Sequence, residues 1–259
     1  MTLAEHHVPG SVDTYYIPNF VTADEESYLL RKIQETPQPK WKQLSNRRLQ
    51  TWGGDLTTKN VLLTQPLPPF ICNYPDLISR IASTGAFDES PHQRPNHVIL
   101  NEYHPGQGIM PHQDGPAYHP VVATLSLGSH TVMHYYDLPA HEREPILSLL
   151  LEPRSLVITT REQYTARAHG IDVVMEDRIR DFELANAAML SSGDDGDGGD
   201  DDDDDDDDND DDGDGVGVTL FPAEGEVLQR RTRYSLTCRD VARVMNVGIE
   251  TRFCRERKF

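Results

Sequence analysis

A histidine and an aspartate separated by one residue form the first candidate site. His112 and Asp114 follow a loop rich in glycine and proline, residues 105–111. In an extended chain, residues i and i+2 point to the same side, so an imidazole and a carboxylate can face one pocket. With a second histidine they would complete the facial triad that binds Fe(II) and leaves positions open for a co-substrate and O₂. The short motif alone fits a surface turn without metal equally well.

The third ligand must come from elsewhere in the chain, and His169 is the candidate. It follows two predicted β-hairpins, where the chain can return to the end of the sheet that carries His112. By itself, His169 also fits a histidine at a strand end. The remaining histidines of this region are interpreted as core or surface residues: His97, His104, His119, His130, His134 and His141.

Two arginines on one predicted strand could bind an organic acid. Arg233 and Arg239 are an even number of residues apart, which places both side chains on the same face of a strand. A dicarboxylate co-substrate held by a metal at one end needs a partner for its far carboxylate. The planar guanidinium is suited to that task because it binds a carboxylate through two parallel hydrogen bonds. The alternative is a pair of ordinary solvent-facing arginines.

The elements that must position these residues are two early helices and a later series of short strands. A capping box of Thr22 and Glu25 predicts a helix that ends before Pro37, and a second helix is expected over residues 77–86. Apolar and β-branched runs between turn residues predict strands at 98–100, 121–127, 131–136, 146–151, 156–160 and 234–239. This order predicts a mostly β (α+β) fold, an antiparallel sandwich or jelly roll with helices packed outside.

The formal net charge of −19 comes mostly from one tract. Residues 193–214 contain 16 Asp, and the rest of the chain has 27 acidic against 24 basic residues. The part that can fold is therefore close to neutral, and nucleic-acid binding is compatible with it. The tract itself lacks the apolar surface needed to fold, so we predict a disordered acidic insert. It is either a solvated loop or a regulatory segment that competes with an anionic ligand.

Three widely spaced cysteines without a CxxC pair argue against a cysteine-based zinc site. The first residues show no signal peptide, and no apolar run is long enough to span a bilayer. We therefore expect an intracellular protein of the cytoplasm or nucleus that does not enter a membrane.

Several motifs occur in the order seen in one enzyme family. The chain resembles AlkB-type Fe(II)/2-oxoglutarate dioxygenases from about residue 15 to residue 244, with the insert excluded. The finer resemblance is to the subfamily of the sixth AlkB homologue. The motifs that carry it are Asn101-Glu102-Tyr103, His112-Gln113-Asp114, His169, Arg233 to Arg239, Leu49 to Gly54, residues 108–112, 125–130 and 149–156.

The resemblance implies a double-stranded β-helix (jelly-roll, cupin-like) fold with the N-terminal helices outside. It implies that His112, Asp114 and His169 bind the iron. Asn101 and Tyr103 would then hydrogen-bond 2-oxoglutarate, Arg233 would pair its distal carboxylate, and Arg239 would lie near the co-substrate or target. The expected organisation is a flexible N-terminus (1–14), one dioxygenase domain (15–192 and 215–247) interrupted by the insert, and a basic C-terminal tail (248–259).

The implied cofactors are Fe(II), 2-oxoglutarate and O₂. Enzymes of this type convert 2-oxoglutarate to succinate and CO₂ while they hydroxylate a C–H bond, and a hydroxylated N-methyl group is lost as formaldehyde. The implied reaction is oxidative demethylation or hydroxylation of an alkylated base in nucleic acid.

The region before the predicted strands supports nucleic acid as the partner. Residues 31–59 hold seven basic and two acidic residues together with both tryptophans. Basic groups interleaved with aromatic rings suit phosphates and stacked bases. The predicted substrate contacts are Trp41, Arg47, Arg48, Gln50 and Trp52.

Three alternatives remain open from sequence. The tryptophans could belong to the core beside a solvated basic face. The same chemistry could act on a protein or small molecule, or the chain could bind nucleic acid with little turnover. No obligate protein partner is implied.

Overall fold

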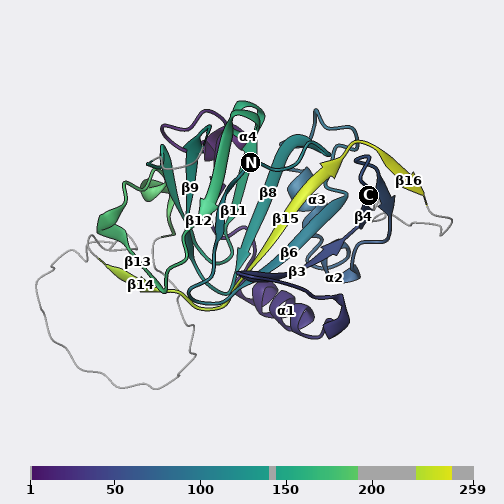
Figure 1. The fold of residues 1–259 in the computed structure, drawn as a ribbon, viewed down its shortest axis with the longest axis horizontal. Helices are drawn as coiled ribbons and strands as arrows, with labels where there is room; N and C mark the ends of the chain where they lie inside the picture. The colour runs from purple at the N-terminus through teal and green to yellow at the C-terminus, as the bar shows by residue number, and fades with distance from the viewer. Residues whose placement is uncertain (1, 140–143, 192–225, 247–259) are drawn as a thin grey trace, which may run out of the picture.

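Two antiparallel sheets form the body of the protein (Figure 1). The structure, a computed structural model, describes residues 2–139, 144–191 and 226–246. In spatial order the larger sheet contains β1 (Thr14–Ile17), β11 (Leu156–Thr160), β8 (Tyr118–Leu127), β15 (Arg233–Val241), β6 (His97–Tyr103), β3 (Arg47–Trp52) and β2 (Lys42–Leu44). The smaller sheet contains β10 (Leu147–Leu151), β9 (Thr131–Asp137), β12 (Arg167–Ile171) and β7 (Ile109–His112).

The central strands of the larger sheet alternate strictly between two environments. In β15, Leu236 and Cys238 belong to the hydrophobic core, whereas Ser235, Thr237 and Arg239 line a cavity on the other face. The neighbouring strands β6 and β8 divide their residues in the same way. Since side chains of a strand point to opposite faces in turn, one strand supplies both core and cavity.

Two helices cover the apolar face of this sheet. In α1 (Ala23–Gln34), Leu29 and Ile33 lie one turn apart and pack against the sheet, and Thr22 caps the first turn as predicted. In α3 (Leu77–Ala82), the buried side chains are Leu77, Ile78 and Ile81. The structure therefore confirms a mostly β fold with helices packed outside the sheet.

The smaller sheet brings distant segments into register at its edge. β7 pairs with β12 so that His112 lies directly opposite His169. The approach is close at Gly108, where a Cβ atom would lie 2.3 Å from the carbonyl oxygen of Ile171. A larger residue at this position would push the loop before β7 away from β12, so glycine is required for the pairing.

Small elements complete the described chain. A three-stranded sheet of β16 (Val244–Asn246), β5 (Leu62–Thr64) and β4 (Gly54–Leu56) lies beyond β3, and β13 (Glu176–Arg178) pairs with β14 (Val227–Gln229). Figure 1 shows these two small sheets at opposite ends of the molecule. The short helices are α2 (Pro69–Cys72), α4 (Arg161–Ala166), η1 (Leu3–His6), η2 (Gln38–Lys40), η3 (Ile179–Asp181) and η4 (Ala187–Met189).

All six predicted strands are present: β11 has the predicted bounds, β10 begins one residue later than predicted, and the other four are longer. The second predicted helix ends four residues early, because the Ser83 and Thr84 hydroxyls bond to carbonyls of the preceding turn and Gly85 adopts a positive φ. Most of the N-terminal segment predicted to be flexible, residues 2–13, is described by the structure. They contain η1, and Val8 is fully buried and donates its N–H to Thr14.

The predicted acidic insert (193–214) and basic tail (248–259) lie outside the described residues. Among the helices of the described ranges, none has the length and apolar character needed to cross a membrane.

Candidate metal centre and co-substrate cavity

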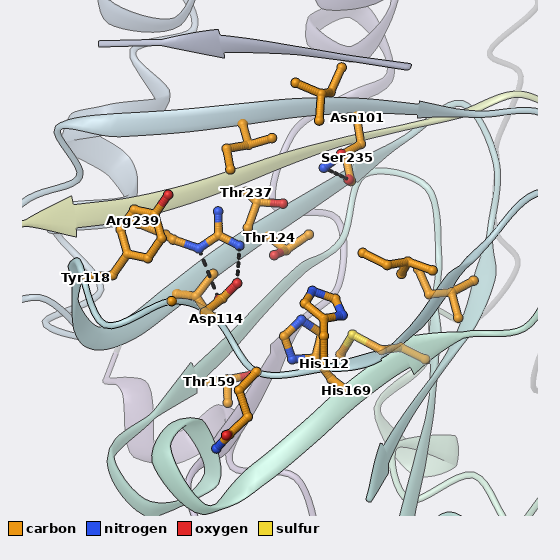
Figure 2. A pocket seen from close by; sticks show the side chains of 18 of the residues that line it. Asn101, His112, Asp114, Tyr118, Thr124, Thr159, His169, Ser235, Thr237 and Arg239 are labelled. Carbon is orange, nitrogen blue, oxygen red and sulfur yellow. Dashed lines mark hydrogen bonds and ion pairs between the residues drawn. The ribbon is translucent and has the colours of Figure 1, made fainter. Parts of the chain in front are cut away.

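A cavity of about 410 Å³ opens between the two sheets (Figure 2). The larger sheet contributes its polar face from β3, β6, β8 and β15, and the smaller sheet contributes β7, β9 and β12. The cavity collects every residue predicted to bind the metal or the co-substrate: Asn101, Tyr103, His112, Asp114, His169, Arg233 and Arg239.

Three potential metal ligands converge on one side of the cavity. His112, Asp114 and His169 each offer one ligand atom, and these atoms all lie within 4.8 Å of one another. The two imidazole rings are 4.5 Å apart, as the register of β7 with β12 requires. Asp114 follows β7 and, as Figure 2 shows, lies beside the two histidines. Two nitrogens and one carboxylate on one side of an open cavity are a donor set suited to a ferrous ion.

Both histidines are arranged to present a lone pair. His112 Nδ1 lies 2.9 Å from the carbonyl oxygen of Met110, a contact that fixes the proton on Nδ1 and leaves Nε2 free for a metal. Burial lowers the pKa of His169 to about 4, although the nearby Asp114 carboxylate acts in the opposite direction. His169 is therefore neutral at physiological pH, as a metal ligand must be.

Asp114 is held in its ionised form by Arg239. The guanidinium binds both carboxylate oxygens, with Nε 3.0 Å from Oδ2 and Nη2 2.5 Å from Oδ1. Burial acts to raise the pKa of Asp114, but the charge and hydrogen bonds of Arg239, together with the nearby His169 and His112, outweigh it and the pKa is lowered. The ring of Tyr118 lies 4.9 Å from the guanidinium carbon and covers it. Arg239 thus contacts a candidate metal ligand directly.

Arg233 is a buried cation without an acidic partner among the described residues. Its residue exposure is 3 %, and its side chain donates a hydrogen bond from Nη2 to the Ser126 hydroxyl at 2.8 Å. Its Nε is buried without a partner. Burial lowers the pKa of Arg233 to about 10, which still leaves it charged. A buried unpaired charge is costly, so this arrangement is suited to an anion that enters the cavity.

Asn101 and Tyr103 lie on the cavity face of β6. The Asn101 side chain accepts a hydrogen bond from Arg47 Nε at 3.1 Å and donates one to the Ser235 hydroxyl at 3.5 Å (Figure 2). The Tyr103 ring centroid lies 5.8 Å from the guanidinium carbon of Arg233. Both polar side chains are therefore close to the arginines that could receive a carboxylate.

The predicted substrate contacts are divided by the alternation of β3. Arg47 lines the cavity, whereas Gln50 and Trp52 are buried on the opposite face. Trp52 belongs to the hydrophobic core and donates its indole N–H to Gln50 Oε1 at 3.1 Å. The alternation of β3 turns both side chains away from the cavity, so the structure does not bring Gln50 and Trp52 together with the other predicted site residues.

Arg48 and Trp41 also belong to the side away from the cavity. Arg48 forms an ion pair with the buried carboxylate of Glu102, and its guanidinium carbon lies 4.3 Å from the ring centroid of Trp41. The same carboxylate accepts a hydrogen bond from the Tyr234 hydroxyl at 2.8 Å. Arg48 thus contacts both Glu102 and Trp41, away from the cavity that holds the predicted metal ligands.

Sequence reasoning missed several polar residues of the cavity. Among them are Tyr118, Thr124, Thr159, Ser235 and Thr237, which Figure 2 shows around the arginine and the candidate ligands. The alternation of polar and apolar residues in residues 233–239 carries the signal for Ser235 and Thr237, since Arg233 and Arg239 share their parity.

Comparison with known proteins agrees with this geometry. Residues 13–239 match the family model of the 2OG-Fe(II) oxygenase superfamily. The chain is similar to "Probable RNA/DNA demethylase ALKBH6" of Danio rerio, with 37 % identity over 91 % of this chain and 88 % of that one. It is also similar to "Uncharacterized protein L905" of Acanthamoeba polyphaga mimivirus, with 32 % identity over 68 % of this chain and 80 % of that one.

A solved structure supports the fold alone. OsALKBH1 superposes with a TM-score of 0.52 at 14 % identity, covering 89 % of this chain and 99 % of that one. The two facing sheets are accordingly those of a double-stranded β-helix, as the sequence predicts.

Proposed function

The chain belongs to the 2OG-Fe(II) oxygenase superfamily, as an AlkB-type member, and on that premise we propose that it demethylates or hydroxylates an alkylated base in nucleic acid. Members of this family use Fe(II), 2-oxoglutarate and O₂. In the proposal His112, Asp114 and His169 bind the iron, and Arg233 receives the distal carboxylate of 2-oxoglutarate.

One observation carries the proposal. A buried, uncompensated guanidinium, Arg233, shares a single cavity with the three convergent ligand atoms. A dicarboxylate that binds a metal at one end and needs a cation at the other fits this pair of features. A buried arginine with a purely structural role is normally paired with a carboxylate, because an unpaired buried charge destabilises the fold.

The residues of the chain prepare the site in separate ways. Arg239 keeps Asp114 ionised and fixes the plane of its carboxylate, while the Met110 carbonyl orients the ring of His112. Asn101 and Tyr103 lie on the same cavity wall as Arg233, and the two sheets enclose this cavity from two sides. With iron, 2-oxoglutarate and O₂ bound, the centre supplies oxidative decarboxylation of the keto acid coupled to hydroxylation of a C–H bond.

Nucleic acid is the substrate class that the similar proteins favour. The Danio rerio relative is described as a probable RNA/DNA demethylase. On the cavity face of this chain, Arg47 adds a further cation, which suits an anionic substrate. With a substrate in RNA or DNA, the enzyme would act in the nucleus or the cytoplasm.

The test is a product assay with the full chain. Purified protein is loaded with Fe(II) anaerobically, and then succinate and formaldehyde are measured with 2-oxoglutarate, O₂ and oligonucleotides with or without N-methylated bases. The proposal expects both products in equal amounts with a methylated oligonucleotide, and expects Asp114→Ala to abolish them. Succinate that rises with a protein extract instead of nucleic acid would assign the chemistry to another substrate.

The variants also test the metal assignment. Normal turnover by Asp114→Ala or His112→Ala would overturn the proposed ligands. Nucleic-acid binding without any succinate from the iron-loaded protein would favour a binding module over an enzyme.

A further inference from the structure

Three guanidinium groups line the cavity, and two of them already have an assignment. Arg239 is paired with Asp114, and Arg233 is buried at the position proposed for the co-substrate. The third, Arg47, is partly exposed and lies at the start of β3. In the described residues no carboxylate pairs with Arg47, and the only hydrogen bond of its side chain uses Nε.

The hydrogen bond to Asn101 orients the Arg47 side chain and uses only one of its donor nitrogens. Because Nε donates to Asn101 Oδ1, the plane of the guanidinium is fixed, and Nη1 and Nη2 remain available. These two groups form the fork that binds two oxygens of a phosphate or carboxylate. The chain thus presents an oriented and unneutralised anion receptor on the cavity wall.

Two more cations lie beside the cavity on the three-stranded sheet. Asn60, in the turn between β4 and β5, lines the cavity, and its neighbour Lys59 is exposed. Arg243, just before β16, is also exposed and donates Nη1 to the Lys59 carbonyl at 3.2 Å. Neither side chain forms an ion pair with an acid in the part of the chain that the structure describes. Within the three strands of this small sheet, the one acidic residue is Asp55 of β4.

This local charge runs against the charge of the whole molecule. The formal net charge is −19, most of it in residues 193–214, and the rest of the chain is close to neutral, so a polyanion must be held by a local group of cations. Such a group is useful for a substrate that carries several phosphates near the base to be oxidised.

We propose that Arg47 binds the backbone phosphate of the target nucleotide and that Lys59 and Arg243 bind a neighbouring phosphate. This inference rests on the proposed function and specifies how its substrate is held. It implies that the enzyme prefers a methylated oligonucleotide to a free methylated nucleoside, because only the oligonucleotide reaches both phosphate contacts.

The test compares arginine variants in binding and turnover. Fluorescence anisotropy of a labelled single-stranded, methylated oligonucleotide is measured for the wild type, Arg47→Gln, Arg47→Lys and the double variant Lys59→Gln/Arg243→Gln. KM for 2-oxoglutarate is measured in parallel. The matched control is Arg178→Gln, which removes the same charge from an exposed pair with Glu176 on β13, at the other end of the molecule (Figure 1).

The proposal expects Arg47→Gln to raise the Kd for the oligonucleotide about ten-fold or more. It also expects a shallower salt dependence, with the slope reduced by about 0.7. KM for 2-oxoglutarate should rise much less than this Kd, since Arg47 acts on the co-substrate only through its hydrogen bond to Asn101. Arg47→Lys should recover part of the affinity, and the double variant should lose less than Arg47→Gln. Arg178→Gln should match the wild type.

Each contrary result has a distinct meaning. An unchanged Kd for Arg47→Gln, with a wild type that binds, would overturn the phosphate contact and leave the proposed function standing. A raised KM for 2-oxoglutarate with an unchanged Kd would assign Arg47 to the co-substrate instead. A wild type that neither binds nor oxidises any oligonucleotide would overturn the proposed function, and the phosphate contact with it.

Discussion

The two faces of the larger sheet differ in character although the same strands form both. The face against α1 and α3 is apolar and fully packed, as Leu236 and Leu100 illustrate. The face toward the cavity carries Arg233 and Ser235 on the same strand β15. Packing against helices fixes the backbone of each strand, and the fixed backbone then aims every second side chain into the cavity. The comparison shows that alternate positions along a strand have different roles: one set packs in the core and the other lines the cavity.

The largest effect is expected from replacing the buried cation of the cavity face. Arg233→Met should raise KM for 2-oxoglutarate about 10- to 100-fold, because a charge-assisted pair with the carboxylate is lost. The apoprotein should not lose thermal stability, since the variant removes an unpaired buried charge from the core edge. Steady-state kinetics and thermal melting check the two halves. A strongly destabilised variant with a normal KM would show that Arg233 stabilises the fold and does not bind 2-oxoglutarate.

Substitutions at neighbouring residues of β15 should affect different properties, one the stability of the fold and the other the affinity for the co-substrate. Leu236→Ala should reduce the free energy of unfolding by about 2–5 kcal/mol, because it opens a cavity in the core. Ser235→Ala should cost less than about 1 kcal/mol and act on co-substrate affinity, since it removes the partner of Asn101. Urea unfolding and KM for 2-oxoglutarate measure the contrast. Equal stability losses would break the division between the faces.

The adjacent arginines of β3 offer a second contrast. Arg48→Gln leaves the buried Glu102 carboxylate without its ion pair and should destabilise the protein by about 1–3 kcal/mol. Arg47→Gln should change stability by less than about 0.5 kcal/mol, since Arg47 has no acidic partner in the described residues. Chemical denaturation separates the two. Equal stability of both variants would contradict the assignment of Arg48 to the structural face.

The effect that is smallest near neutral pH is a dependence of stability on pH below 6.5. Burial lowers the pKa of His97 to about 4 from its ordinary value of 6.5, and the charge of Arg239 acts in the same direction. Between these values the unfolded chain takes up a proton that the native His97 does not. The free energy of unfolding should therefore fall as pH is lowered from 6.5 toward 4, by at most about 1.4 kcal/mol per pH unit for this group.

His97→Gln provides the control for this prediction. It should flatten the dependence, whereas His169, whose pKa is lowered in the same way, remains in both proteins. Identical pH profiles for the variant and the wild type would show that His97 does not titrate as its burial requires.

Sequence predicts the strands that contain runs of apolar or β-branched residues and misses the short or polar ones. Residues 121–127 and 156–160 have strong β propensity, and both form strands. β7 contains Pro111, and β12 contains Gly170, so neither has a strand signal of its own. They become strands through their pairing with each other and of β12 with β9.

The site follows the same rule. The parity of Arg233 and Arg239 is visible in sequence, and it predicts their common face correctly. The substrate prediction for residues 31–59 rests on the number of basic and aromatic residues and does not consider which face of the strand each one occupies. It therefore groups Arg47 with Gln50 and Trp52. The contact of Arg239 with Asp114 joins residues 125 positions apart, and no local pattern encodes it.

The central claim is that one cavity holds a metal at His112, Asp114 and His169 and a keto acid at Arg233. Anaerobic equilibrium dialysis of the full chain with Fe(II) and 2-oxoglutarate tests it most directly. The account predicts one iron and one 2-oxoglutarate bound per chain, loss of the iron in Asp114→Ala, and loss of 2-oxoglutarate with iron retained in Arg233→Met. Normal iron binding by Asp114→Ala, or normal 2-oxoglutarate binding by Arg233→Met, would contradict it.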